Sequence, residues 1–122
     1  MKPDIATRKD IELIMRNFYG NLLSDAEIAY IFIDVAKIDL EKHLPHLADF
    51  WEQNILNIGS YRNNVLKIHV DLHELEPLTA NHFQIWLRHF NATIDESFSG
   101  EKSELMKTRA LSIATVMQLK LT

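Results

Sequence analysis

The sequence contains no cysteine, and it has only three glycines and three prolines in 122 residues. The missing cysteine excludes disulfides, thiolate zinc sites and a thiol nucleophile. The glycines, Gly20, Gly59 and Gly100, lie far apart, so the sequence has no glycine-rich phosphate loop. No Asn-Gly or Asp-Gly turn joins alternating apolar and polar runs, and β-hairpins therefore have little support.

Long apolar runs and a surplus of positive charge are also missing. No run reaches the roughly 18 apolar residues of a membrane-spanning helix, and the N-terminal MKPDIATRKD lacks the apolar centre of a signal peptide. We therefore expect a cytoplasmic protein that does not bind membranes. The formal net charge is −4 and the 13 basic residues are scattered, so nucleic acid is not an expected partner.

The composition that is present is that of a folded domain. Hydrophobic residues make up 47% of the chain and charged residues 25%, a balance typical of globular proteins. A chain of 122 residues has the length of one domain and can bury a core. We expect residues 1–122 to form a single domain.

Apolar residues at helical spacing predict an all-α fold. The clearest helix is expected over about residues 8–23, behind a capping pair formed by Thr7 and Asp10. Its apolar face has the i, i+3, i+4 pattern and consists of Ile11, Ile14, Met15, Phe18 and Leu22.

A corner and a second long helix are expected next. Ser24 and Glu27 have the spacing of a capping box and predict a shorter helical stretch after a tight corner. The following helix is expected to be regular from about Leu44 to Gly59, with Pro45 in its first turn, where proline is tolerated. This placement leaves His43 just ahead of the regular helix.

The second half of the chain predicts a loop and two more helices. Residues 59–64 read as an irregular loop, followed by one or two short turns. Thr79 is expected to open a long helix that Gly100 closes. One face of the last helix is apolar and contains Leu105, Met106, Ala110, Ile113 and Met117.

Six histidines invite a search for metal or catalytic sites. His69 and His73 have i, i+4 spacing but no HExxH motif, so a zinc hydrolase is not favoured. His46 and His89 are expected to face solvent. No GxSxG motif is present, and a serine nucleophile cannot be argued.

Three side chains that end in a polar group, namely Tyr19, His43 and Trp86, are expected on otherwise apolar helix faces. Buried tyrosine and tryptophan normally have a hydrogen-bond partner. Aromatic residues at helical spacing are, however, mostly core filling, and on their own these three predict no more than an aromatic-rich core.

The ordered set of residues resembles the truncated haemoglobins, and among them group III most closely. The resemblance covers nearly the whole chain. Its landmarks are Phe18-Tyr19, Ile31-Phe32, His43-Leu44-Pro45, Phe50-Trp51, Tyr61, Leu66, His69, His82-Phe83, Ile85-Trp86-Leu87, Thr93-Ile94-Asp95, Phe98-Ser99-Gly100 and Arg109-Ala110.

This resemblance implies a globin-like two-over-two helical sandwich that encloses a haem. The haem would be of b type, because a chain without cysteine cannot form thioether bonds to it. His69 corresponds to the proximal iron ligand. Tyr19, Phe32, His43 and Trp86 correspond to the distal ligand pocket. Further haem contacts are expected from Phe50, Tyr61, Arg62, Lys67 and Phe83, with Arg62 and Lys67 considered as propionate partners. Asn63-Asn64-Val65 replaces the glycine and proline that relatives often have before the proximal helix.

The resemblance also implies a function. We expect the protein to bind dioxygen and other small ligands, namely nitric oxide, carbon monoxide and peroxide, and to support peroxidase-like or nitric oxide detoxification chemistry with an unidentified reductase. A monomer or weak dimer is expected. The alternative from another class is a haem-free helical interaction module whose aromatic stripe is only core.

Overall fold

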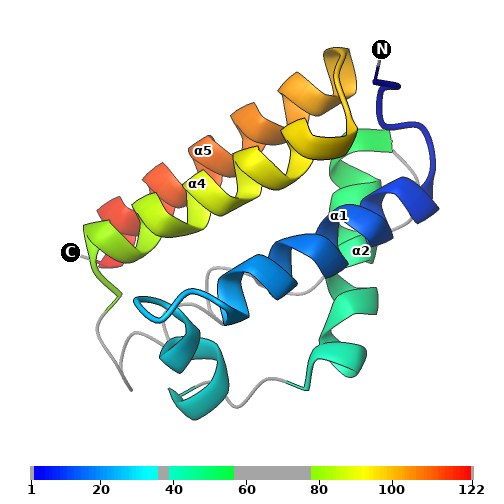
Figure 1. The fold of residues 1–122 in the computed structure, drawn as a ribbon. Coiled ribbons are helices and arrows are strands. Elements are labelled where there is room, and N and C mark those ends of the chain that lie inside the picture. The colour runs from blue at the N-terminus through cyan, green and yellow to red at the C-terminus, as the bar shows by residue number, and fades with distance from the viewer. Residues whose placement is uncertain (1, 36–38, 57–77, 122) are drawn as a thin grey trace.

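Helices account for all the regular structure in the part of the chain that the computed structural model describes, residues 2–35, 39–56 and 78–121. In chain order these are α1 (Arg8–Leu23), the π-helical segment η1 (Ile31–Val35), α2 (Leu40–Leu56), α4 (Ala80–Ser97) and α5 (Glu101–Leu121) (Figure 1). The all-α prediction is therefore confirmed. Among these helices, none is long and apolar enough to cross a membrane.

Helix α1 begins and ends where the sequence predicts. The Thr7 hydroxyl accepts a hydrogen bond from the backbone N–H of Asp10 at 3.4 Å, and the Asp10 carboxylate accepts one from the N–H of Thr7 at 3.0 Å. This capping box satisfies two N–H groups that a helix leaves without partners at its start.

The capping box predicted for Ser24 and Glu27 is wrong. Ser24 instead ends α1, and its hydroxyl donates to the carbonyl oxygen of Gly20 at 2.8 Å. Asp25 caps the next turn by accepting a hydrogen bond from the N–H of Glu27 at 3.0 Å. An aspartate two residues before an N–H forms this local turn readily, and the chain then enters η1 rather than a regular α-helix.

Helix α2 begins earlier than predicted. The carbonyl oxygen of Asp39 accepts hydrogen bonds from the N–H groups of Lys42 and His43 at 3.2 and 2.9 Å, which closes the first turn. Pro45 therefore lies inside the helix, not at its start. Consequently, His43 belongs to the first turn of α2 and has a fixed direction relative to Leu44 and the core.

Helix α4 begins at the predicted place, after the N-cap Thr79, but it ends at Ser97. The prediction that Gly100 closes this helix is wrong, because Gly100 opens α5. Its carbonyl oxygen accepts the N–H of Glu104 at 3.0 Å, and its φ of 143° is in a region that favours glycine.

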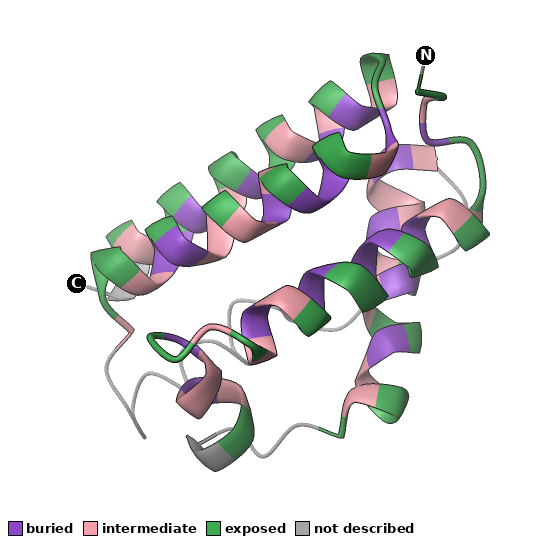
Figure 2. Cartoon of the chain, viewed as in Figure 1, coloured by how far each residue is buried: buried purple, intermediate pink, exposed green. Residues whose placement is uncertain are grey.

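The helices form two packed pairs. Helix α1 packs against α2, and α4 packs against α5, while α1 also lies against α4. Figure 1 shows α4 and α5 side by side above α1 and α2. The buried residues face the space between the two pairs, and exposed residues cover the outside (Figure 2).

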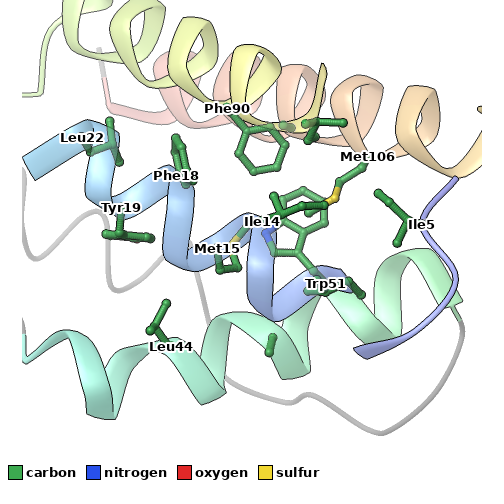
Figure 3. Packing of buried hydrophobic residues seen from close by; sticks show 14 of the residues in the cluster. Ile5, Ile14, Met15, Phe18, Tyr19, Leu22, Leu44, Trp51, Phe90 and Met106 are labelled. Atoms are coloured by element: carbon green, nitrogen blue, oxygen red, sulfur yellow. The ribbon is translucent and has the colours of Figure 1, made fainter. Parts of the chain in front are cut away.

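Aromatic rings fill the centre of this sandwich. Phe18 of α1 and Phe90 of α4 meet edge to face, with centroids 5.1 Å apart, and neither is more than 1% exposed. Trp51 of α2 contacts Phe90 at 5.3 Å, so rings from three helices meet there. Figure 3 shows these side chains, together with Met106 of α5, converging between the helices. Edge-to-face rings stabilise a core beyond the area they bury.

Candidate functional site

The candidate site begins at Tyr19, which follows Phe18 in α1. Successive residues of a helix point in directions about 100° apart. Phe18 therefore faces α4, while Tyr19 faces α2 and η1 (Figure 3). The Tyr19 side chain is 5% exposed, so its hydroxyl is a polar group inside an apolar core.

Two predicted site residues lie against Tyr19. The His43 ring is 5.6 Å from the Tyr19 ring, and its Nε2 lies 3.3 Å from the Tyr19 hydroxyl. Phe32 of η1 approaches the same ring edge to face at 5.6 Å. Side chains of α1, α2 and η1 therefore meet at Tyr19. Tyr19 and His43 form a polar pair, and Phe32 forms an apolar wall beside it.

Trp86 of α4 contacts Phe18, the residue that precedes Tyr19 in α1. Its ring stacks on Phe90 at 5.1 Å with an interplanar angle of 18°, and it contacts the edge of Phe18 at 5.5 Å. Trp86 is half-buried. Among the described residues, its indole N–H has no hydrogen-bond partner. The ring is held by its contacts with Phe90 and Phe18.

Burial reinforces the neutral form of the Tyr19 phenol. Removal from water raises the pKa of its phenol well above the ordinary value, because burial disfavours the phenolate. The hydroxyl therefore keeps its proton at neutral pH and can donate one hydrogen bond.

This donor set has the chemistry that one face of a haem requires. A porphyrin needs apolar contact over most of its area, and a small ligand on its iron needs a few hydrogen-bond donors in a dry setting. Phe32, Phe50 and Trp86 are large apolar side chains that the protein leaves half-buried. The hydroxyl of Tyr19 and the imidazole of His43 supply the polar groups. These residues fit the distal side of a haem.

The remaining predicted haem contacts divide into two groups. Phe50 lies next to Trp51 on α2, with the rings 5.1 Å apart, and Phe83 packs with Ala114 and Met117 of α5. The second group falls outside the described residues and comprises the predicted iron ligand His69 with Tyr61, Arg62 and Lys67. The haem contacts of both groups stay predictions.

Sequence reasoning missed a hydrogen bond between Tyr30 and His82, whose Oη and Nε2 lie 3.1 Å apart. A local signal existed for His82 alone, because Thr79 and His82 have capping-box spacing. Nothing in the sequence pointed to Tyr30, 52 residues away.

The prediction that His89 faces solvent is wrong, whereas His46 is exposed as predicted. The His89 side chain is only 22% exposed, and its Nε2 lies 2.7 Å from the Asp25 carboxylate. The hydrogen bond from His89 lowers the pKa of Asp25, and the N–H of Glu27 and the charge of Arg88 add to this effect. In the described part of the chain, no three histidine or acidic side chains lie close enough together to hold a metal ion.

Comparisons with known proteins give a consistent result. The chain is 27% identical over 121 residues to the group 3 truncated hemoglobin ctb of Campylobacter jejuni subsp. jejuni, which covers 97% of this chain and 93% of that protein. Among solved structures, it is similar to the crystal structure of a group III truncated hemoglobin from Campylobacter jejuni, with a TM-score of 0.87 and 27% identity over 100% of this chain and 96% of the other. No protein-family model matches the chain. The predicted two-over-two fold class is therefore confirmed.

Proposed function

We propose that this chain, a homologue of group III truncated haemoglobins, is a haem protein that binds dioxygen and related small ligands. The single observation that carries this function is the buried Tyr19 hydroxyl beside His43, walled by Phe32. The Tyr19 hydroxyl and His43 Nε2 satisfy each other, but apolar side chains would fill the same space without the cost of burying two polar groups. A polar pair at this place is therefore what a small polar ligand requires and core packing does not.

His69 is the proposed iron ligand, and the haem would be of b type. A bound haem would supply an iron atom able to bind a diatomic ligand, and Tyr19 and His43 would be the polar side chains available to that ligand. The protein itself provides hydrogen-bond donors, exclusion of water and shape. Phe32 and Trp86 contribute the apolar surface that keeps the site dry, and in a dry site each hydrogen bond is electrostatically stronger than in water.

The Tyr19 and His43 pair offers two arrangements of protons. If His43 carries its proton on Nδ1, its Nε2 accepts the Tyr19 O–H. If the proton is on Nε2, the imidazole donates to the Tyr19 oxygen, and the Tyr19 O–H is then directed to the ligand. The second arrangement makes Tyr19 the donor that slows ligand release, and His43 the residue that orients it.

Haem uptake tests this proposal. Purified protein mixed with haemin should give a sharp Soret band, and the reduced protein should give a distinct spectrum with carbon monoxide. His69→Gly should abolish the sharp band, because it removes the proposed axial ligand. His46→Gly is the matched control, since His46 is exposed, and it should behave as the unaltered protein does.

The result that contradicts the proposal is equally clear. Protein that gives only the broad absorption of free haemin, and melts at the same temperature with and without it, would support the haem-free interaction module instead. A cofactor that binds only the folded chain must raise the melting temperature by mass action. A Soret band that survives in His69→Gly would remove only the assignment of the ligand.

Turnover with peroxide or nitric oxide is a finer part of the proposal. Donors such as Tyr19 and Trp86 can stabilise negative charge that develops when an O–O bond breaks. Stopped-flow mixing of the haem-loaded protein with peroxide should then show a fast reaction that slows in Tyr19→Phe. A reaction of the dioxygen complex with nitric oxide, in a one-to-one ratio, would favour detoxification. Slow ligand release argues against bulk transport.

A further inference from the structure

The corner between α1 and η1 is attached to α4 by two histidine contacts that the proposed ligand site does not use. His89 contacts Asp25 near the start of this corner, and His82 contacts Tyr30 near its end. The two histidines are seven residues apart in α4, which corresponds to about two turns on the same side of the helix. The corner is therefore held at both ends.

The second contact has a defined direction. The Nδ1 atom of His82 accepts a hydrogen bond from the backbone N–H of Thr79 at 3.1 Å, while the N–H of His82 donates to the Thr79 hydroxyl at 3.2 Å. A neutral imidazole that accepts through Nδ1 carries its proton on Nε2. The Nε2–H must then donate to the Tyr30 oxygen, 3.1 Å away.

This contact joins the two sides of the proposed site. Tyr30 lies two residues before Phe32, which contacts Tyr19. His82 lies one helical turn before Trp86 on α4. Tyr30 and His82 also touch through their rings, whose centroids are 5.9 Å apart. A change at this contact therefore shifts the corner that carries Phe32 relative to the helix that carries Trp86.

We propose that His82 and Tyr30 are positioning residues, which set the separation of Phe32 and Trp86. The two hydrogen bonds to Thr79 fix His82 at the start of α4, so its Nε2–H is directed at the Tyr30 oxygen. This role rests on the proposed ligand-binding function, because Phe32 and Trp86 are the proposed walls of that site.

Two variants separate the parts of the contact. Tyr30→Phe removes the hydrogen bond to His82 and leaves the helix cap intact. His82→Gln keeps an acceptor for the Thr79 N–H, as glutamine does in capping boxes, but it removes the imidazole that contacts Tyr30. His46→Gln is the matched control, because it makes the same substitution at an exposed histidine.

The first measurement needs no haem. The chain has two tryptophans, Trp51 and Trp86, so an amide proton–nitrogen NMR spectrum of the full-length protein shows two indole signals, which Trp86→Phe assigns. Tyr30→Phe and His82→Gln should each displace the Trp86 signal from its position in the unaltered protein, measured at the same pH.

The second measurement uses the reduced, haem-loaded protein. Tyr30→Phe and His82→Gln should each change the carbon monoxide affinity by about two- to tenfold, the factor expected from one neutral hydrogen bond. His46→Gln should leave the affinity and the Trp86 signal unchanged. The proposal is overturned if the Trp86 signal is the same in both variants as in the unaltered protein. Failure to take up haem would refute the proposed function, while the haem-free spectra would still decide this inference.

Discussion

Replacing Asp4 with asparagine tests how the N-terminal segment supports the fold. The Asp4 carboxylate lies at the start of α5 and accepts hydrogen bonds from the backbone N–H groups of Lys102 and Ser103 at 2.8 and 2.9 Å, and from the Ser103 hydroxyl at 2.8 Å. It thereby caps a helix almost a hundred residues away in sequence. Asparagine has nearly the same shape, but it lacks the charge and presents an N–H₂ group to these donors.

The expected loss follows from the two contributions of the carboxylate. A helix cap stabilises by about 1 kcal/mol, and a negative charge at a helix N-terminus adds about 0.3 to 1 kcal/mol. Asp4→Asn should therefore lower the free energy of unfolding by about 1.3 to 2 kcal/mol. For a chain of this length, the melting temperature should fall by roughly 5 to 8 °C.

The pH dependence of Asp4→Asn provides an independent check. Partial burial raises the pKa of Asp4, but the hydrogen bonds from Lys102, Ser103 and Ile5 outweigh it, so the pKa lies below its ordinary value. A carboxyl with a lowered pKa stabilises the fold above the unfolded-state pKa, and this stabilisation is lost as the pH falls through the folded-state value. The difference between the two proteins should therefore be full at pH 7 and shrink below about pH 4.

Thermal unfolding followed by circular dichroism measures both effects. Glu96→Gln is the matched control, because Glu96 is an exposed acidic residue of α4, and it should change the melting temperature by less than about 2 °C. Equal melting temperatures for Asp4→Asn and the unaltered protein at pH 7 would refute the capping role. A difference that stayed constant down to pH 3 would show that the charge contributes nothing.

Three further predictions concern the glycines, the core and the site. Gly100→Ala should destabilise the fold by more than about 1 kcal/mol, because its φ is 143° and a Cβ would lie 2.5 Å from the Asp4 side chain. Gly20→Ala should instead stabilise the fold by about 0.5 to 1 kcal/mol, since a Cβ there meets nothing within 4 Å. The melting temperatures of the two variants show the sign of each effect. Phe90→Ala should cost about 3 to 5 kcal/mol in urea unfolding, because the ring is fully buried, and a loss below 1 kcal/mol would contradict its central place. Tyr19→Phe should speed dioxygen release from the haem-loaded protein by about two- to tenfold, and an unchanged rate would show that the hydroxyl does not reach the ligand.

The elements that the sequence predicted well are those whose signals are local. The Thr7 and Asp10 pair gives the start of α1 directly, because both partners of the capping box lie within one turn. The pattern failed at Ser24 because Asp25, one residue later, makes the same kind of bond with a carboxylate. Two neighbouring residues with equal capping ability cannot be ranked from spacing alone.

The candidate site was less accessible to sequence reasoning, because its contacts join distant segments. Tyr19 and His43 are 24 residues apart, and His89 and Asp25 are 64 apart. Periodicity shows which face of a helix is apolar, but it does not show which helix covers that face. For this reason, the residues alone predicted only an aromatic core, and the grouping of Tyr19 with His43 and Phe32 came from the resemblance to the truncated haemoglobins.

The core and the candidate site depend on the same rings. Phe18 contacts Phe90 on one side and Trp86 on another, and Trp86 stacks on Phe90. Tyr19 is the next residue of the same helical turn, so any shift of α1 that repacks Phe18 also moves the Tyr19 hydroxyl. Close-packed rings transmit such shifts, because the interior has little free volume to absorb them. We therefore expect substitutions in this core to change the proposed ligand binding even at positions that do not contact the ligand. The effect should be larger where α1 shifts further against α4.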